Sequence, residues 1–307
     1  MTMALTAPFG PIPLRAARWT PEDARRLCVE FAREHYENFP VVFAMLSREA
    51  RDALAAIYAF ARIADDFADE PAYEGLREQL LDGWEAQLRH CLDPAADLHP
   101  VFLALAGAIR RYDLPLQAFL DLLSAFRQDC RAPVYQTTEQ LLDYCRRSAN
   151  PVGRLVLRVF GAADPRLDAL SDRLCTALQL TNFWQDLSVD LPRGREYLPD
   201  EDLAQVGLSR DVLHAPDEAL DALVRLECER TSRLFAESRA LLTEAPARSR
   251  PYLALVWLGG RTVLAMVSAL GARVFRQRPS LSAGFVARWA VATAWRLPHG
   301  RRSTLEA

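Results

Sequence analysis

The sequence of 307 residues contains no lysine, so all 37 of its basic residues are arginine. Schiff-base enzymes, pyridoxal-phosphate enzymes and Walker-A nucleotide-binding proteins each need a lysine, and the sequence therefore excludes these three classes. The formal net charge is −3, which lacks the strong positive balance of a nucleic-acid-binding protein. No nucleic-acid partner is expected.

Paired cysteines are also missing from the chain. The six cysteines form no Cys-x-x-Cys pair and have no histidine partner at zinc-site spacing, which is typical of reduced, mostly buried thiols in a cytosolic protein. Residues 1–19 lack the basic start and the long apolar run of a signal peptide, and Pro8, Pro11 and Pro13 interrupt them. We expect a cytoplasmic protein in which residues 1–19 are a flexible lead.

Strand signals are scarce, and helix signals dominate. Residues 20–23, Thr-Pro-Glu-Asp, are typical of a helix start, with a capping hydroxyl, a proline at the first helical position and acids in the first turn. Proline and glycine divide the rest of the chain into helix-sized segments. The sequence predicts an all-α fold, with one domain of roughly ten helices over residues 20–278.

Two apolar or basic segments raise the question of a membrane. The run over residues 252–271 is long enough to span a bilayer, but Arg261 and the Gly259-Gly260 pair lie at its centre, so a buried core helix is the preferred interpretation. Residues 279–307 form a basic amphipathic segment. Its composition suits peripheral contact with the anionic inner membrane, and the alternative is that it packs on the domain and faces solvent.

Two other segments place polar side chains at helical spacing among apolar residues. Residues i and i+4 share a helix face, so each segment is predicted to carry one polar stripe. A solvated surface is the usual interpretation of either stripe alone. The stripes consist of Tyr58, Arg62, Asp65 and Asp69 in one segment and Gln179, Asn182, Asp186 and Asp190 in the other.

The apolar surroundings of both stripes favour a metal site. Unpaired buried carboxylates are costly, so two facing acidic helices must be neutralised by metal ions or by protons. Oxygen ligands indicate Mg²⁺, with Mn²⁺ as the alternative. A di-iron bundle would need Glu-x-x-His, and none of the five histidines has a glutamate three residues before it. Because Mg²⁺ also takes substrate phosphates, the predicted ligand is a prenyl diphosphate in an apolar cleft.

At these residues the sequence resembles the squalene/phytoene synthase family. The family motif Tyr-x-x-x-Arg-x-x-Asp-x-x-x-Asp is matched over residues 58–69, and Gln-Leu-x-Asn-x-x-x-Asp-x-x-x-Asp is matched over residues 179–190. The resemblance implies a class I isoprenoid-synthase helical bundle of the trans-prenyltransferase type around a central apolar cavity. Shorter matches lie at Tyr144-Cys145, Val152-Gly153, Arg195 and Tyr197.

Two segments are similar to the hydroxysqualene synthase branch of this family. HYENFPV at residues 35–41 stands where many condensing members carry a Lys-Ser-Phe-Ser-like segment, and SANPVGRLVL at residues 148–157 stands where they show a Val-Ala type segment. The resemblance implies conversion of presqualene diphosphate and water to hydroxysqualene and diphosphate in hopanoid biosynthesis. It also implies functional coupling to a presqualene diphosphate synthase and no need for NADPH.

The resemblance further implies roles for single residues. The expected metal ligands are Asp65, Asp69, Asn182, Asp186 and Asp190. The expected substrate-binding residues are Asn38, Phe39, Arg62, Gln179, Arg195 and Tyr197. The expected catalytic residues are Tyr58, Arg62, Tyr144, Glu37 and His35. Which side chain positions the attacking water stays open among His35, Tyr36, Glu37 and Tyr144.

Three alternatives remain at this level. A condensing member that makes presqualene diphosphate, squalene or phytoene would use the same acidic motifs. A non-catalytic scaffold relative is expected to have lost aspartates, whereas this chain keeps all four. A class I terpene cyclase usually has Ser or Thr and Glu in its second motif, and the pair Asp186 and Asp190 argues against that class.

Overall fold

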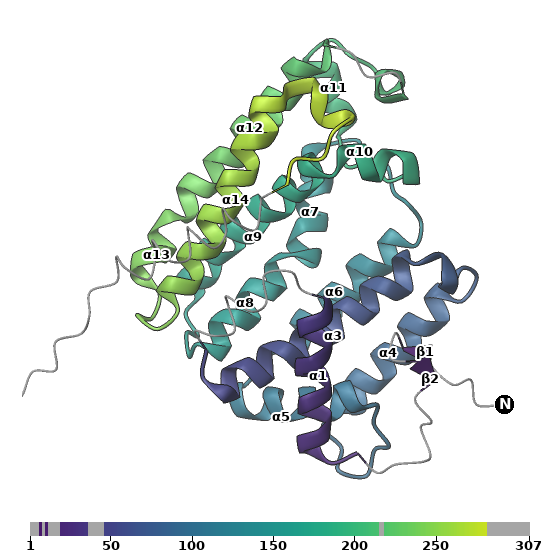
Figure 1. Ribbon diagram of the computed structural model, residues 1–307, viewed down its shortest axis with the longest axis vertical. Coiled ribbons are helices and arrows are strands. Elements are labelled where there is room, and N and C mark those ends of the chain that lie inside the picture. The colour runs from purple at the N-terminus through teal and green to yellow at the C-terminus, as the bar shows by residue number, and fades with distance from the viewer. Residues whose placement is uncertain (1–5, 8–9, 12–18, 36–45, 215–217, 281–307) are drawn as a thin grey trace, which may run out of the picture.

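The computed structural model describes residues 6–7, 10–11, 19–35, 46–214 and 218–280, and these form a helical assembly (Figure 1). The prediction of an all-α domain of about ten helices is confirmed, because ten α-helices of ten or more residues make up most of the described chain. They are α1 (Pro21–His35), α3 (Arg48–Asp69), α4 (Arg77–His90), α5 (Pro100–Tyr112), α6 (Leu116–Asp129), α7 (Thr138–Ser148), α8 (Asn150–Val159), α9 (Pro165–Gln185), α12 (Leu220–Glu237) and α14 (Arg250–Leu270).

Shorter elements connect these helices. A two-residue antiparallel pair, β1 (Thr6–Ala7) with β2 (Gly10–Pro11), is the one strand pairing in the described residues. The short helices are α10 (Leu187–Asp190), α11 (Asp200–Gln205) and α13 (Leu241–Glu244), together with the 3₁₀ turns η1 (Pro71–Tyr73), η2 (Leu191–Arg193), η3 (Arg210–His214), η4 (Ser238–Ala240) and η5 (Gly271–Phe275).

Side-chain caps fix where the first two long helices begin. The Thr20 hydroxyl accepts a hydrogen bond from the Asp23 backbone N–H at 3.1 Å, so α1 starts where its sequence predicts. The Ser47 hydroxyl accepts one from the Ala50 N–H at 3.2 Å and starts α3. Each cap satisfies a backbone N–H that has no partner inside the helix. Both helices therefore begin at a defined residue, which sets the direction in which their side chains point.

Two hydrophobic clusters hold the helices together. The first lies among α1, α3, α4, α5 and α6 and is centred on fully buried rings such as Phe60, which meets Phe119 edge-on at 5.2 Å. The second lies among α7, α9, α12 and α14 and contains the buried rings of Trp184 and Phe235. Figure 1 shows these two groups as the lower and upper parts of the molecule. Helix α6 packs on α7 and α8, and α8 packs on α9, so the two groups form one body.

Helix α14 is buried along one face only, which corrects the expectation of a buried core helix over residues 252–271. Its Trp257 indole donates a hydrogen bond to the Phe235 carbonyl at 2.9 Å, and Gly260 lies so close to α9 and α12 that a Cβ atom would meet Phe235 Cζ at 2.8 Å. Leu258 is 37% exposed on another face. By length and composition, Arg250–Phe275 is the one stretch of the described chain apolar enough to cross a membrane, which is weak evidence for a span. The amphipathic segment proposed for membrane contact falls, beyond residue 280, outside the described residues.

Candidate active site

The first acidic row lies on the C-terminal half of α3, a helix whose other faces are buried. Its side chains are partly accessible: Asp65 is 36% exposed and Asp69 is 24% exposed. Between them Asp66 is buried, and it takes an ion pair from Arg62 at 2.6 Å. The predicted stripe is therefore present on α3. Asp65 and Asp69 are partly accessible to solvent, whereas the neighbouring Asp66 is buried against Arg62.

The second acidic row spans a break between two helices, so the stripe predicted from helical spacing does not lie on one continuous helix. Helix α9 ends at Gln185, Asp186 leaves the helical conformation at φ −99° and ψ 9°, and α10 follows. The backbone still bonds from Asp186 N to Asn182 O at 2.9 Å and from Asp190 N to Asp186 O at 2.8 Å. Because these bonds keep the four-residue spacing, the polar side chains stay aligned.

The two rows meet in space. The Arg195 guanidinium, which follows the second row, lies 2.9 Å from Oδ1 of Asp69 in the first row. The Asp69 charge is also near enough to contribute to the raised pKa of Asp190. The rows thus come together where Asp69, the last residue of α3, meets Arg195 in the segment after α10.

Loss of water, reinforced by neighbouring carboxylates, raises the pKa values of three of these acids. Although part of the Asp65 side chain is exposed, the surrounding protein removes water from its carboxylate, and this loss together with the Asp69 charge raises its pKa to about 7. Loss of water, followed by the Asp186 charge, raises the pKa of Asp190 to about 6. Loss of water also raises the pKa of Asp69. A site in which several carboxylates resist ionisation is one that gains from a bound cation.

The carboxylate oxygens of the two acidic rows are the kind of ligand that Mg²⁺ takes in proteins. In the part of the chain that the structure describes, no three acidic, histidine or cysteine side chains gather closely enough to hold an ion by themselves. Mg²⁺ commonly takes one or two carboxylates and fills the rest of its shell with water and substrate phosphates. The two rows supply carboxylate oxygens of the kind that this mode of binding uses, and in this structure Asp65, Asp69 and Asp186 are each paired with an arginine.

Both expected phosphate-binding arginines are paired with acids of the first row. Arg62 lies 2.6 Å from Asp66 and 3.4 Å from Asp65, and Arg195 contacts Asp69. These ion pairs hold both guanidinium groups next to the carboxylates at the C-terminal end of α3. Each arginine can exchange a carboxylate for a phosphate with little movement, because both anions accept the same fork of N–H donors.

A third arginine, Arg278, was missed by the sequence reasoning. Its Nε and Nη2 donate to the two carboxylate oxygens of Asp186, the latter at 3.4 Å, while the Gln185 amide donates to the Pro279 carbonyl at 2.7 Å. The chain just before the amphipathic segment therefore lies on the second acidic row. The arginine excess in the C-terminal region was the available signal, and the sequence reasoning assigned it to a membrane.

The structure also brings together Tyr58 and His35, two of the expected catalytic residues. The Tyr58 hydroxyl donates to the His35 carbonyl at 3.1 Å, and the His35 ring nitrogen Nδ1 bonds the Phe31 carbonyl at 3.0 Å. The His35 side chain is exposed at the end of α1. Glu37, Asn38 and Phe39, with Tyr36, lie outside the described residues.

On one side of the site, a cluster of aromatic rings packs beside the segment that carries Arg195. The rings of Phe183 and Tyr197 stack at 3.8 Å with an angle of 8°, and the Tyr144 ring lies 6.1 Å from Phe183. The Tyr144 hydroxyl donates to Oδ2 of Asp129, the last residue of α6, at 2.9 Å. Asp129 was also missed, because a single acid at the end of an apolar helix gives no pattern.

The remaining predicted residues lie on α9. Gln179 is partly buried, and Asn182 is exposed on the same helix. The burial of these two side chains does not by itself assign either of them a role in binding.

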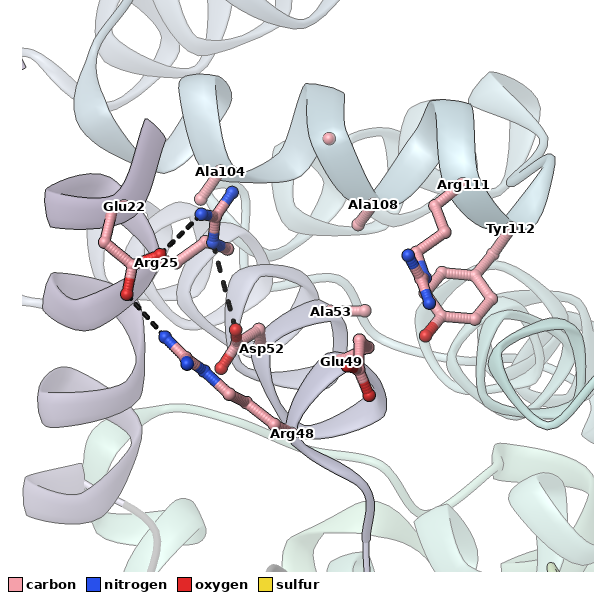
Figure 2. Close-up of a pocket in the computed structure, with 11 residues that line it drawn as sticks. Glu22, Arg25, Arg48, Glu49, Asp52, Ala53, Ala104, Ala108, Arg111 and Tyr112 are labelled. Carbon is pink, nitrogen blue, oxygen red and sulfur yellow. Dashed lines mark hydrogen bonds and ion pairs between the residues drawn. The ribbon is translucent and has the colours of Figure 1, made fainter. Parts of the chain in front are cut away.

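Figure 2 shows a different recess, of about 490 Å³, between α1, α3 and α5. Several of the charged side chains that line this recess are paired with one another. Arg48 lies 2.6 Å from Glu22, and Arg25 lies 2.6 Å from the same carboxylate. Asp52 on α3 lines this recess, about 20 Å from Asp65 at 1.5 Å of helix rise per residue. The recess is therefore separate from the acidic rows.

An all-α domain in which two acidic rows meet across the fold is a helical isoprenoid synthase. The family model described as squalene/phytoene synthase matches residues 32–284, and the chain belongs to that family. It is 32% identical over 266 residues to phytoene synthase from Mycobacterium tuberculosis, which covers 85% of this chain and 87% of the relative. It is 37% identical over 208 residues to hydroxysqualene synthase from Sinorhizobium fredii, covering 67% of this chain and 68% of the relative.

Solved structures agree with this assignment. The chain is similar to squalene synthase HpnC from Alicyclobacillus acidocaldarius, with a TM-score of 0.77 and 40% identity over 82% of this chain and 95% of that one. A dehydrosqualene synthase, at 23% identity, has a TM-score of 0.80 over 90% of this chain and 96% of its own, and shares the fold. The resemblance found in the sequence motifs is confirmed.

Proposed function

We propose that the protein converts presqualene diphosphate and water to hydroxysqualene and diphosphate. The meeting of the two acidic rows beside Arg195 carries the proposal, since it forms one place for a diphosphate. The similarity to the hydroxysqualene synthases from Sinorhizobium fredii and, at 34% identity over 212 residues, Rhodopseudomonas palustris supports the choice of reaction. The latter match covers 68% of this chain and 71% of the relative.

Departure of the diphosphate is the first step to be assisted. Bound Mg²⁺ supplies Lewis-acid stabilisation of the leaving charge. Arg62 and Arg195 each donate charge-assisted hydrogen bonds to phosphate oxygens in place of their present carboxylate partners. The residues that would hold the metal ions are Asp65, Asp69, Asn182, Asp186 and Asp190.

The cation left behind rearranges by opening its cyclopropane ring, and it needs surroundings that are poor in water. The stacked rings of Phe183 and Tyr197 and the buried ring of Tyr144 offer aromatic faces on that side of the site. Such faces stabilise a cation by about 0.5–2 kcal/mol each. One water then attacks a defined carbon, and the product is an alcohol instead of a hydrocarbon.

A condensing synthase is the second candidate function. The phytoene synthase relative matches a larger share of this chain than the hydroxysqualene synthases do, 85% against 67%. Such an enzyme would join two allylic diphosphates and would use the same acidic rows. The substrates separate the two proposals, because only the condensing enzyme starts from farnesyl or geranylgeranyl diphosphate alone.

The test incubates the purified protein with Mg²⁺ and no NADPH in three separate arms: presqualene diphosphate, farnesyl diphosphate alone, and geranylgeranyl diphosphate alone. We expect hydroxysqualene and one equivalent of diphosphate from the first arm, with ¹⁸O in the alcohol when the water is H₂¹⁸O. A C30 or C40 product from either of the other arms would overturn the proposal in favour of condensation.

A further inference from the structure

The stretch over residues 195–200, which follows the second acidic row, has little backbone structure of its own. At its start Arg195 N bonds the Asp190 carbonyl at 3.0 Å, and at its end Asp200 N bonds the Tyr135 carbonyl at 3.0 Å. Within the described chain, none of the three residues that follow Arg195 donates a backbone hydrogen bond, and none of them is helical. Side chains must therefore fix how this stretch lies against the acidic rows.

One side chain, Arg210 in η3, spans this stretch. Its Nη1 donates to Oε2 of Glu196 at 2.5 Å, its Nη2 to the Leu198 carbonyl at 3.0 Å and its Nε to Oδ1 of Asp200 at 2.8 Å. Its Nη2 also lies 3.4 Å from the Tyr135 carbonyl. A guanidinium can do this because it is a rigid planar group with several N–H donors. Arg210 thus ties three alternate residues of the stretch to one rigid group.

The residues between these anchors face the candidate site. Arg195 contacts Asp69, and Tyr197 stacks on Phe183. The stretch is not helical, and Pro199 at its end has extended dihedral angles of φ −68° and ψ 143°. In an extended chain successive residues point to opposite sides, so a group that holds alternate residues on one side directs the others to the opposite side. The anchors of Arg210 therefore decide which side chains the stretch presents to the acidic rows.

Arg210 lies between two acids, Glu196 and Asp200, so it holds the stretch without adding net positive charge beside the acidic rows. Its side chain is 21% exposed, and that of Glu196 is 16% exposed. Ion pairs this far from solvent are costly to break, because the partner that remains keeps its charge with little water around it. The expected effect of Arg210 on a bound diphosphate is therefore one of geometry and not of attraction.

Resting on the proposed role of Arg195 as a diphosphate ligand, we propose that Arg210 is a positioning residue that holds Arg195 where the diphosphate binds. The guanidinium of Arg210 fixes the alternate residues of the stretch, and the fixed stretch directs Arg195 toward Asp69 and an arriving phosphate. This role is the same for hydration of presqualene diphosphate and for condensation, since both reactions release diphosphate.

The test measures the binding of inorganic diphosphate with Mg²⁺ by titration calorimetry, with no turnover step. Arg195→Gln should weaken this binding about 10–100-fold, through loss of a hydrogen bond from a charged donor. Arg210→Lys keeps the charge but should weaken binding about 5–10-fold, because a compact ammonium cannot span the three anchors. In the double variant the dissociation constant should match that of Arg195→Gln within about twofold, because Arg210 acts only through Arg195.

Glu196→Ala separates position from charge. If charge alone mattered, removal of this anion would tighten diphosphate binding. Loss of an anchor should instead weaken it at least about threefold, because Arg195 is then less well preorganised. Arg154→Gln is the matched control and should bind as wild type. Its guanidinium also forks onto an acid, Asp172, at 2.8 Å, and this acid lies about 20 Å along α9 from Asp186.

Three results would overturn the role of Arg210. The first is wild-type binding in both Arg210→Lys and Glu196→Ala. The second is a double variant whose loss equals the product of the two single losses, since Arg210 would then act independently of Arg195. The third is unchanged binding in Arg195→Gln. Where Arg210→Lys does not reach the wild-type melting temperature, Glu196→Ala and its double variant with Arg195→Gln give the same comparison.

Failure of the proposed function is distinguishable from these results. A wild-type protein that does not bind diphosphate with Mg²⁺ would reject the diphosphate site, and the role of Arg210 with it. A wild-type protein that binds diphosphate but turns over only allylic diphosphates would reject the proposed reaction alone. In that case the losses in Arg210→Lys and Glu196→Ala would still support the positioning of Arg195.

Discussion

The Arg195 guanidinium lies 2.9 Å from the Asp69 carboxylate and so joins the segment after the second acidic row to the end of the first. Both side chains are about one-quarter exposed, so the contact is neither a surface ion pair nor a fully buried one. Loss of water raises the pKa of Asp69 even with Arg195 beside it, which means that the arginine does not fully offset the loss of water around this carboxylate. The contact places one cation and several acids where a diphosphate with metal ions would fit.

Arg195→Gln should lower kcat/KM for the prenyl diphosphate by about 10²–10³, the usual cost of removing one fixed donor to a developing charge. The melting temperature should change little, because a partly exposed ion pair contributes little to stability. Arg173→Gln is the control: its pair with Glu237 at 2.7 Å is half exposed and remote from the acids. A loss of less than threefold in kcat/KM for Arg195→Gln would contradict the assigned role.

Asp65→Asn should weaken the binding of Mg²⁺ with inorganic diphosphate. In the wild type, the two ligands together should raise the melting temperature, because ligands that bind only the folded state stabilise it, by about 2.7 kcal/mol at one hundred times Kd. The variant should show a clearly smaller rise at equal concentrations. Asp82→Asn, a 71% exposed acid that pairs with Arg127, should keep the full rise. Equal rises in Asp65→Asn and wild type would remove Asp65 from the metal ligands.

Glu227 makes the stability of the protein depend on pH. It is 1% exposed, and loss of water raises its pKa from the ordinary 4.5 to about 8, with Asp202 as a further cause, although Arg230 lies 3.0 Å away. Between about pH 4.5 and 8 the folded protein keeps a proton that the unfolded chain has lost, so this group's contribution to stability falls as the pH rises.

Glu227→Gln should therefore match the wild type near pH 5 and exceed its melting temperature above pH 8. We expect at least about 2–4 °C, which corresponds to about 1 kcal/mol in a domain of 150–250 residues. Glu229→Gln, an exposed change on the same helix, should show no such divergence. A difference that stays constant from pH 5 to 8.5 would show that Glu227 is ionised throughout this range.

Adjacent glycines in α14 should respond oppositely to alanine. A Cβ atom at Gly260 would lie 2.4 Å from Leu178 Cδ2 and 2.8 Å from Phe235 Cζ, whereas one at Gly259 meets nothing within 4 Å. Gly260→Ala should destabilise the protein by about 1–3 kcal/mol through overpacking. Gly259→Ala should be neutral or stabilising by up to about 1 kcal/mol, the helix preference of alanine over glycine. Denaturant unfolding measures both, and equal effects would contradict the close packing of α14 on α9 and α12.

Much of the candidate site could be predicted because its spacing is local. The four-residue steps of Asp65 and Asp69, and of Asp186 and Asp190, depend only on helix geometry, and the structure keeps both. The helix break at Asp186 was not predictable, because no proline or glycine stands there. The identity of the reaction also lies beyond the spacing of the acids, since a condensing enzyme would use the same two acidic rows.

The sequence alone determined the all-α class, the start of α1 and the two acidic stripes, because each follows from side chains a few residues apart on one helix. Only the tertiary structure decided that Arg195 meets Asp69, that Tyr144 points at Asp129 and that Arg278 covers Asp186. Each of these pairs joins different elements, so it depends on how the two hydrophobic clusters pack together. A periodic pattern fixes which face of a helix is polar, and the packing of the cores fixes what that face meets.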